Sequence, residues 1–223
     1  MEEFLNAWYG KAAFIAFDVI ALVAVICITY RWLFKRILDI LVSAVCIIVL
    51  SPLFAVLCGQ GAAAKKRGEA ETVFLRTPYV GKKGKTVQLL TFRGGKFEKL
   101  PRLFDVFLGK LSFIGCKPMC EKDVSFLTDV EKDRHIAKPG LINPLVLRGD
   151  VDTDYEEMLR SDKKYAWNFA FFKDVKIFFC WLLRQIRGEG NFYLGETRKS
   201  SYAEFLLNEG KITQADFDAA DKA

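Results

Sequence analysis

The sequence has very little histidine and no regular spacing of cysteine. Its 223 residues include one His and six Cys. Because no short Cys spacing recurs, nothing indicates a disulfide framework, and we expect reduced thiols in a cytosolic domain. Cys116, Cys120 and His135 form the best metal-ligand combination, but they are loosely spaced and lack a fourth ligand. Packing or chance explains these three residues better than a metal site does.

Nucleic-acid-binding motifs are also missing, although the formal net charge is +6. Glu2 and Glu3 stand where a secretory signal peptide would carry basic residues, so we expect no such peptide. Basic residues instead gather beside the apolar segments, where each Lys or Arg near an anionic leaflet contributes about 1 kcal/mol of attraction. These residues are Arg31, Lys35, Arg36, Lys65, Lys66 and Arg67. The expected partner is therefore anionic lipid rather than nucleic acid.

Apolar residues concentrate in two runs, Ala12–Tyr30 and Ile37–Leu57. Each run has about the length that a bilayer core demands of a helix. Cations follow the first run, which predicts a transmembrane helix in residues 1–33 with its C-terminal end in the cytoplasm. Asp18 lies inside this run, and an Asp at the helix centre costs about 2.5–3.5 kcal/mol. We expect Asp18 to lie near the membrane interface, where this cost is small. The alternative is that a charged partner or protonation of Asp18 offsets the cost.

The second run, in residues 34–64, has cations at both ends. The positive-inside rule accommodates both ends only if they lie on the same side of the membrane. Ser51 and Pro52 fall well inside the run, and a Pro there removes a backbone hydrogen bond and favours a bend. We therefore expect a re-entrant helix kinked at Ser51-Pro52. A Pro-kinked spanning helix, with the freed carbonyl bonded by the Ser51 hydroxyl, is the alternative.

Residues 65–190 predict a small cytosolic domain, so the whole chain is assigned to a mainly helical α+β class. A basic turn joins two short strands, and the last helix is amphipathic and typical of a membrane interface. Ala137–Asp150 predicts a loop, since Pro and Gly punctuate it. The expected elements are strands at Thr72–Arg76 and Thr86–Phe92 and helices at Leu100–Leu108, at Tyr155–Lys164 and from Trp167 to an end at Gly188.

The C-terminal tail, residues 191–223, predicts two short helices separated by Gly210. Thr213 and Asp216 are spaced like a capping box at the start of the second helix. A solvated terminus is the preferred interpretation of this tail, and a protein-contact role is the alternative.

Five segments in this order resemble the bacterial sugar transferase family, the monotopic polyprenyl-phosphate phosphoglycosyl transferases. They fall within Lys35 to Leu183 and read KRILDILVSAVCIIVLSPLFAVL, VFLRTPYVGKKGK, LPRLFDVFLGKLSFIGCKP, RHIAKPGL and NFAFFKDVKIF. The resemblance implies a re-entrant anchor in the bacterial inner membrane and a catalytic-like domain facing the cytoplasm. It also implies transfer of a sugar 1-phosphate from a nucleotide sugar to polyprenyl phosphate, with help from Mg2+.

The family mechanism uses an Asp-Glu pair immediately before Leu-Pro, in which Asp attacks the phosphate and Glu helps to hold the metal. Here Glu98 and Lys99 occupy these two positions. The longer Glu98 side chain displaces the carboxylate by roughly an ångström, which can cost about a hundredfold in rate. Lys99 replaces a metal ligand by a cation and leaves Glu98 as the one candidate ligand in the pair. As an alternative, Lys99 itself neutralises the diphosphate of the donor.

Other departures weaken the expected site. Relatives carry some tens of residues before the catalytic pair, whereas only Gly94–Phe97 follow Arg93 here. Lys117 and Lys138 stand where the family has Arg, so the bidentate grip on phosphate is lost. Asp105 stands where relatives have Asn, and we interpret it as a surface residue rather than as a displaced nucleophile. The candidate phosphate-binding residues, with a plain solvated basic face as the alternative, are Arg76, Arg93, Lys117 and Lys138.

Two functions follow from these residues. The first is sugar-1-phosphate transfer from a UDP-sugar to polyprenyl phosphate in polysaccharide or glycan biosynthesis, with Glu98 as nucleophile and Mg2+ weakly bound or replaced. The second is a catalytically inactive relative that binds polyprenyl phosphate, or regulates an active glycan-assembly partner, or assembles with further copies of itself. A purely structural membrane protein is a third hypothesis, which predicts that neither nucleotide nor polyprenyl phosphate binds.

Overall fold

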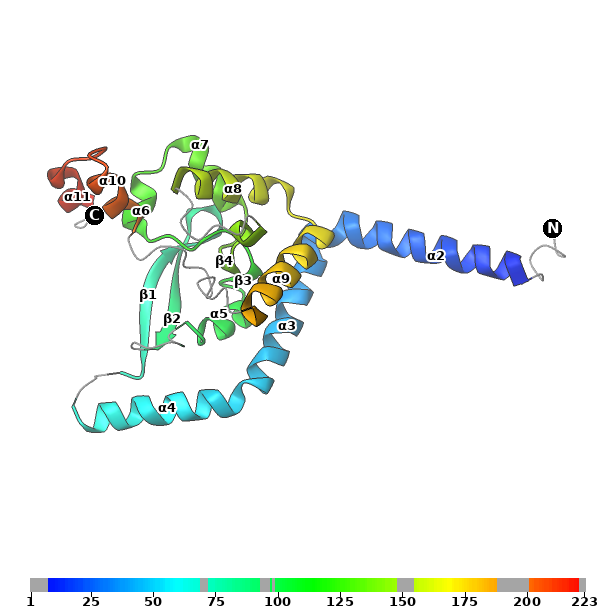
Figure 1. Cartoon of the computed structure of the whole chain (residues 1–223), viewed down its shortest axis with the longest axis horizontal. Helices are drawn as coiled ribbons and strands as arrows, with labels where there is room; N and C mark the ends of the chain where they lie inside the picture. Colours follow the sequence, from blue (N-terminus) through cyan, green and yellow to red (C-terminus); the bar gives the residue numbers. More distant parts are fainter. Residues whose placement is uncertain are drawn as a thin grey trace.

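The computed structural model describes residues 8–68, 72–92, 97, 99–147, 155–187 and 201–220 (Figure 1). The predicted class is confirmed, because the described chain is mainly helical with two small sheets. Its longer elements are α2 (Trp8–Thr29), α3 (Lys35–Val49), α4 (Ser51–Lys66), α5 (Arg102–Leu108), α8 (Tyr155–Asn168), α9 (Phe171–Ile186), β1 (Phe74–Val80) and β2 (Thr86–Phe92). The shorter ones are α6 (Glu121–Ser125), α7 (Asp129–Lys132), α10 (Tyr202–Asn208), α11 (Gln214–Ala220), β3 (Ser112–Ile114) and β4 (Gly140–Ile142).

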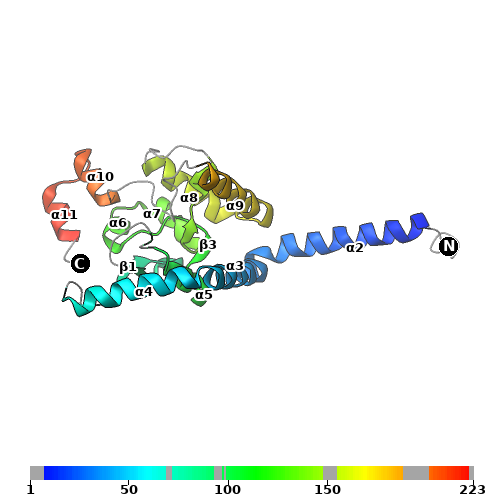
Figure 2. The same cartoon turned by 60° about the horizontal axis from the view of Figure 1, so that its bottom comes forward.

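Helix α2 projects away from the rest of the molecule in both views (Figures 1 and 2). Its side chains from Lys11 to Val25, including Asp18, are exposed. Taken singly, no helix of the described part of the chain has both the length and the apolar composition of a membrane span. The transmembrane role of residues 1–33 therefore stays a prediction, and residues 1–7 lie outside the described part.

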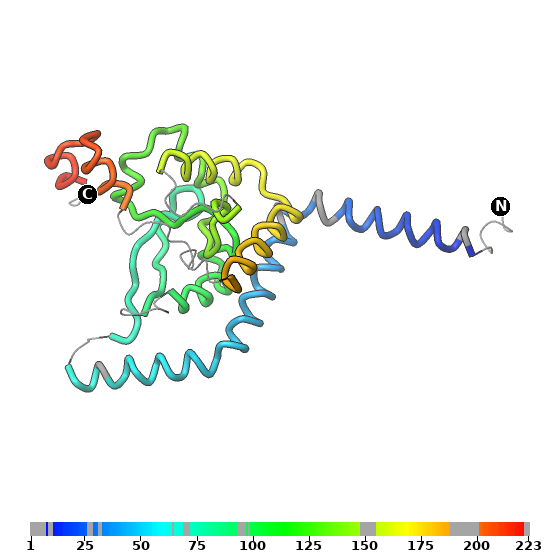
Figure 3. The backbone as a smooth tube through the Cα atoms, in the orientation of Figure 1, coloured from blue at the N-terminus to red at the C-terminus, as the bar shows by residue number. Residues whose placement is uncertain are grey.

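Helices α3 and α4 meet the composition of a membrane segment only as a pair, and that pair is bent by 66°. Leu50 separates the two helices, and Pro52 lies in the first turn of α4. A Pro is tolerated there because the first turn of a helix does not use its N–H groups. The tube in Figure 3 follows the chain through this bend and along α4, towards β1. The structure thus has the predicted bend at Ser51-Pro52, while re-entry into a membrane stays a prediction.

Strands β1 and β2 form the predicted hairpin, paired antiparallel from Phe74↔Phe92 to Val80↔Thr86. Its tight turn places Lys83 and Gly84 at φ values of 58° and 72°. This left-handed conformation suits Gly and strains most other residues.

A second, unpredicted sheet pairs β3 with β4 in parallel. The prediction of a loop from Ala137 to Asp150 was wrong in part, because β4 and a 3-10 turn at Pro144–Leu147 lie within it. A Cβ on Gly140 would lie 2.1 Å from the backbone nitrogen of Gly115. Only glycine permits this approach, so the two segments pack backbone against backbone.

Two hydrophobic clusters hold the domain together. The larger one joins α4, α5, α9 and both sheets through residues such as Phe54, Leu89, Val106, Leu141 and Ile177. Burial of such side chains contributes about 1.5–3 kcal/mol each. Helix α3 lies against α5 and β3, so the first half of the bent pair is part of this body.

The smaller cluster contradicts the prediction of a solvated tail for α10, whereas α11 has no buried residue. Tyr202 and Leu206 of α10 are buried against Tyr155 and Met158 of α8. The Ala203 N–H donates to the Asp123 carboxylate at 2.9 Å, which adds a polar contact between α10 and α6. The sequence shows the short helices but not the surface that receives them, because that surface comes from α6 and α8.

Candidate active site

The predicted catalytic pair is described only in part, since Glu98 lies outside the described residues. Lys99 is buried, with 7% of its surface exposed, in the turn that leads into α5. Its carbonyl oxygen accepts a hydrogen bond from the Arg102 N–H at 3.0 Å. The chain therefore carries a buried cation where the resemblance implies a carboxylate.

Arg102 is a second buried cation at the start of α5, and sequence reasoning missed it. Its guanidinium donates to the Tyr79 hydroxyl at 3.1 Å and lies 5.0 Å from the centroid of the Tyr79 ring. Such a contact stabilises a cation by about 0.5–2 kcal/mol. The pair joins α5 to β1, and the helical spacing of the apolar residues alone gave no sign of it.

Asp105 is fully buried, so its interpretation as a surface residue was wrong. Its carboxylate accepts the Leu90 N–H at 2.7 Å and the Lys110 ammonium at 3.1 Å. Helix α5 packs this face against β2, which explains the burial. Because both carboxylate oxygens are engaged, Asp105 joins two elements and does not act as a nucleophile.

The described donor set does not fit Mg2+. Mg2+ prefers carboxylate and other oxygen ligands in octahedral geometry. Within the described ranges, no group of three or more His, Cys, Asp or Glu side chains is placed to hold a metal ion. The buried Lys99 ammonium repels a cation, and Asp105 is taken up by its own partners. Of the predicted pair, Glu98 remains the candidate ligand for Mg2+, which stays a prediction.

Lys117 lies in a loop that is fixed by Asp162 of α8. The Asp162 carboxylate accepts the Lys117 N–H at 3.1 Å and the Asn143 amide at 3.0 Å, and it also pairs with the buried Arg134 guanidinium. Burial raises the pKa of Asp162, while Arg134 opposes this shift. The Lys117 ammonium lies 4.9 Å from the centroid of the Tyr155 ring. This network fixes the loop backbone and directs Lys117 towards α8.

Lys138 contributes to a cavity of about 230 Å³ that we call the cationic pocket. Its described lining consists of Lys35, Arg36, Asp39, Lys82, Ser112, Ala137, Lys138, Tyr165 and Phe169. The Lys138 ammonium donates to the Gly109 carbonyl at 2.8 Å, and Arg36 donates to the Val106 and Phe107 carbonyls at 2.7 Å each. Both cations thus lie at the C-terminal end of α5, where the helix dipole is negative.

Burial and neighbouring cations act together on Lys138. Burial lowers its pKa, and the nearby Arg36 and Lys82 act in the same direction, whereas Asp39 opposes them. Burial is the largest cause of the lowered pKa of Lys138, and the neighbouring cations add to it.

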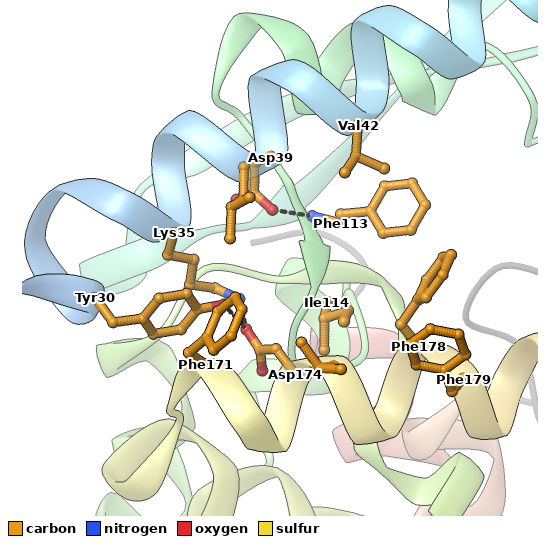
Figure 4. Close-up of a pocket in the computed structure, with 12 residues that line it drawn as sticks. Tyr30, Lys35, Asp39, Val42, Phe113, Ile114, Phe171, Asp174, Phe178 and Phe179 are labelled. Atoms are coloured by element: carbon orange, nitrogen blue, oxygen red, sulfur yellow. Dashed lines mark hydrogen bonds and ion pairs between the residues drawn. The ribbon is translucent and has the colours of Figure 1, made fainter. Parts of the chain in front are cut away.

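A buried polar cluster fixes α3 against α9 beside this pocket (Figure 4). Asp174 pairs with Lys35 and accepts the hydroxyls of Tyr30 at 2.6 Å and Tyr165 at 2.7 Å. Asp39 of α3 accepts the Ser112 hydroxyl at 2.8 Å and the Phe113 N–H at 2.9 Å. These bonds fix the orientation of α3 on the domain.

A second cavity, of about 180 Å³, opens between α3 and α9. Lys35 and Asp39 line both cavities, so this pair forms a wall between them. Figure 4 shows the Lys35–Asp174 cluster at one end of the second cavity and aromatic side chains at the other. The cavity is therefore polar at one end and apolar along the rest of its length.

Comparison with known proteins supports the resemblance drawn from the sequence. Residues 95–187 match the family model described as "Bacterial sugar transferase". This match and the named relatives support the resemblance to the bacterial sugar transferase family over residues 95–187. An uncharacterized sugar transferase, EpsL, of Bacillus subtilis is 30% identical over 89 residues, which cover 40% of this chain and 44% of that protein.

Two named relatives match a larger share of this chain. The UDP-glucose:undecaprenyl-phosphate glucose-1-phosphate transferase of Klebsiella pneumoniae is 26% identical over 183 residues, or 66% of this chain and 38% of the relative. The exopolysaccharide production protein ExoY of Sinorhizobium fredii is 21% identical over 189 residues, or 65% of this chain and 82% of the relative. The matched parts thus span less than half of the Bacillus and Klebsiella relatives.

The structure does not bring the predicted phosphate-binding residues together in one site. Lys138 lines the cationic pocket, whereas Arg76 is exposed on β1 opposite Leu90, and Lys117 points to the Tyr155 ring. Arg93 lies outside the described residues. The sequence identified Lys35 and Arg36 as lipid-attracting charges, but it gave no sign that they converge with Lys138.

Proposed function

We propose that this sugar transferase moves a sugar 1-phosphate from a UDP-sugar to a polyprenyl phosphate at the cytoplasmic face of the bacterial inner membrane, as a step of polysaccharide or glycan assembly. The observation that carries the proposal is the cationic pocket beside the polar end of the bent apolar helix pair. A phosphate group needs cationic donors, and a lipid substrate needs them at the membrane surface. The name of the Klebsiella relative, UDP-glucose:undecaprenyl-phosphate glucose-1-phosphate transferase, supports the same chemistry.

The packing of α3 supports a re-entrant anchor. Lys35 and Arg36 attach the start of α3 to α9 and α5, so this end of the bent pair lies with the domain. The chain leaves the other end, at Lys66, towards β1 of the same domain. Large apolar side chains in between are exposed, among them Leu41, Val45, Ile48, Val49 and Val56. A segment with both ends on one side enters and leaves the same leaflet, which is our proposal for residues 34–64.

The proposed chemistry proceeds in two displacements. The Glu98 carboxylate attacks the phosphorus next to the sugar, a Glu–O–P bond forms, and the P–O bond to the nucleoside monophosphate breaks. An oxygen of the lipid phosphate then attacks the same phosphorus, and the Glu98 carboxylate leaves. Lys99 contributes positive charge beside the reacting phosphoryl group. Neither displacement is assigned to a metal ion, because the described donors do not fit one.

The buried position of Lys99 supports a second candidate function. A cation at this position weakens metal binding, since like charges about 4 Å apart repel by roughly 4 kcal/mol at an effective dielectric of 20. In this hypothesis the protein is a catalytically inactive relative. It retains the lipid-binding surface and regulates an active glycan-assembly partner or assembles with copies of itself.

Release of nucleoside monophosphate tests the first function. The full chain in neutral detergent is incubated with undecaprenyl phosphate and a panel of UDP-sugars, with and without Mg2+. We expect the unmodified protein to release nucleoside monophosphate with at least one UDP-sugar, and we expect Glu98→Gln to abolish this release. Glu209 is exposed, and the control Glu209→Gln is expected to release nucleoside monophosphate at the rate of the unmodified protein. Absence of release with every donor, from folded protein, contradicts the enzyme hypothesis and favours the inactive relative. Equal release by Glu98→Gln excludes Glu98 as the nucleophile.

A further inference from the structure

A groove of about 300 Å³ lies between α7, α8 and α10, outside the candidate active site. Leu159 of α8 and Tyr202 and Leu206 of α10 are buried in it and give it an apolar floor. Its described rim is charged and consists of Glu131, Glu156, Arg160, Lys163 and Lys211. In Figure 1 the three helices lie at the top of the view and α4 at the bottom, so the groove is remote from α4. An apolar floor inside a charged rim is typical of a surface that binds protein.

Arg160 is the one rim cation without a carboxylate partner in the described part of the chain. Lys211 pairs with Glu156 at 3.1 Å. Lys163 pairs with Asp133 at 3.8 Å. The remaining rim carboxylate belongs to the capping box of α7. Since the exposed Arg160 guanidinium carries five N–H donors, the groove fits a partner that brings both a small apolar surface and a carboxylate.

Helix α11 is a segment of this chain with the matching chemistry. Its seven residues include two Asp and no Lys or Arg, and none of them is buried. A helix of this length is unstable alone in water, because most helical stability in proteins comes from packing against other elements. Asp218 is exposed, and among the described residues its carboxylate accepts only the neutral Gln214 amide, at 2.9 Å. Helix α11 therefore offers a carboxylate of the kind that Arg160 lacks.

In its own chain α11 lies on α6 and leaves the groove open. The Lys122 ammonium lies 3.3 Å from the centroid of the Phe217 ring, and no described residue of α11 lines the groove. The opposite side of the helix is exposed and carries Ala215, Asp218 and Ala219. Because α10 lines the groove and a short turn joins it to α11, the two surfaces are neighbours. A two-fold axis beside α10 would bring α11 of each copy to the groove of the other.

We propose that the C-terminal helices are a dimer contact, in which α11 of each copy docks in the groove of the other and Asp218 of one copy pairs with Arg160 of the other. The tail lies beyond residues 95–187 that match the family model, so the resemblance gives it no role. A standard interface buries about 800 Å² per partner, and one short helix covers less, so the dimer needs both contacts. We expect a Kd of about 1–100 µM. The contact is independent of the proposed function, because the predicted catalytic pair takes no part in it.

Sedimentation velocity of the full chain in neutral detergent measures the dimer over a range of protein concentrations. Arg160→Glu and Asp218→Arg each place like charges together twice in the dimer, so each is expected to weaken the Kd by more than about tenfold. An equimolar mixture of these two variants is expected to dimerise as the unmodified protein does, because both contacts of a mixed dimer then join opposite charges. Lys164→Glu is the matched control, since Lys164 is exposed on α8 and does not line the groove. It is expected to change the Kd by less than about twofold.

The mixture of variants separates contact between copies from an effect on folding. Dimers that reappear in the mixture, from two variants that are monomeric alone, support the exchange of α11. Single variants that stay monomeric when mixed overturn it, and so does an unmodified protein that is monomeric at every concentration. A dimer that neither variant weakens forms through another surface and also overturns the proposal. An equal loss in Lys164→Glu assigns the effect to the general charge of α8 and overturns the pairing of Arg160 with Asp218.

Discussion

At the scale of single residues, position 99 decides which chemistry the chain supports. A carboxylate there would complete an acidic pair with residue 98, whereas the buried Lys99 ammonium opposes a divalent cation. Neighbouring Arg102 adds a second buried positive charge, stacked on Tyr79. We therefore propose that the start of α5 favours direct interaction between protein cations and phosphate oxygens over interaction through a metal.

This interpretation predicts the effect of restoring the family pair. In Glu98→Asp/Lys99→Glu the nucleophile regains its shorter side chain and the like charge disappears. We expect nucleoside monophosphate release to rise at least about tenfold and to become dependent on Mg2+, since a misplacement of roughly an ångström alone can cost about a hundredfold. The assay is a Mg2+ titration of release beside the unmodified protein.

Lys99→Met provides the control for this double variant, because it removes the charge without adding a carboxylate. If Lys99 is an electrostatic helper, the rate falls in Lys99→Met. Folding of each variant is checked by thermal unfolding in detergent. A double variant that is folded and gains no Mg2+-dependent release contradicts our account of position 99.

At the scale of elements, local sequence patterns predicted what depends on neighbours in the chain. The apolar run of α2, the break at Ser51-Pro52, the β1–β2 hairpin and the amphipathic α9 all follow from periodicity and from Pro and Gly. The β3–β4 pair was missed because each strand has three residues and its partner is remote in sequence. Parallel pairing of this kind leaves almost no local pattern.

The candidate site was predicted less well for the same physical reason. Lys138 was identified, but its neighbours Arg36 and Lys82 come from α3 and from the hairpin turn. Asp105 was misplaced because helical spacing alone does not say which face of α5 meets β2. Charges that converge through tertiary packing are visible only when the elements are assembled.

The contact between β3 and β4 gives a prediction at this scale. In Gly140→Ala the new Cβ would lie 2.1 Å from the Gly115 nitrogen, so the strands must separate. We expect the free energy of unfolding to fall by about 1–3 kcal/mol or more, as in overpacked cores. Gly59→Ala is the matched control, because no atom lies within 4 Å of its new Cβ and Ala favours a helix. Equal stability of the two variants, measured by denaturant unfolding in detergent, would show that β3 and β4 are not in close contact.

At the scale of the whole molecule, the bent helix pair, α9 and the cationic pocket lie on a common body. Asp174 joins α9 to α3 through Lys35, and Arg36 joins α3 to α5. The exposed apolar residues Phe172, Phe179, Leu183 and Ile186 continue along α9. An interfacial α9 remains a prediction, but its attachment to α3 means that any membrane contact of α9 also positions the pocket.

The single histidine permits a prediction about the stability of the entire fold. Burial, with neighbouring Arg134, lowers the pKa of His135 from 6.5 to about 4. Between these two pH values the unfolded chain binds a proton at this residue and the folded chain does not, so stability rises with pH across the window. We expect the Tm of the detergent-solubilised protein to fall as the pH is lowered from 6.5 to 4.5.

His135→Gln isolates this contribution, because the sequence has no other histidine that titrates in the window. The variant is expected to lose a measurable part of the pH dependence of Tm between pH 4.5 and 6.5, while its Tm at pH 4.5 approaches that of the unmodified protein. Carboxylates with shifted pKa values, such as Asp162, remain in both proteins and supply the common background. If both proteins show the same slope over this window, His135 takes up its proton equally in the folded and unfolded states, and its burial between Arg134 and the Gly81 backbone has no energetic consequence.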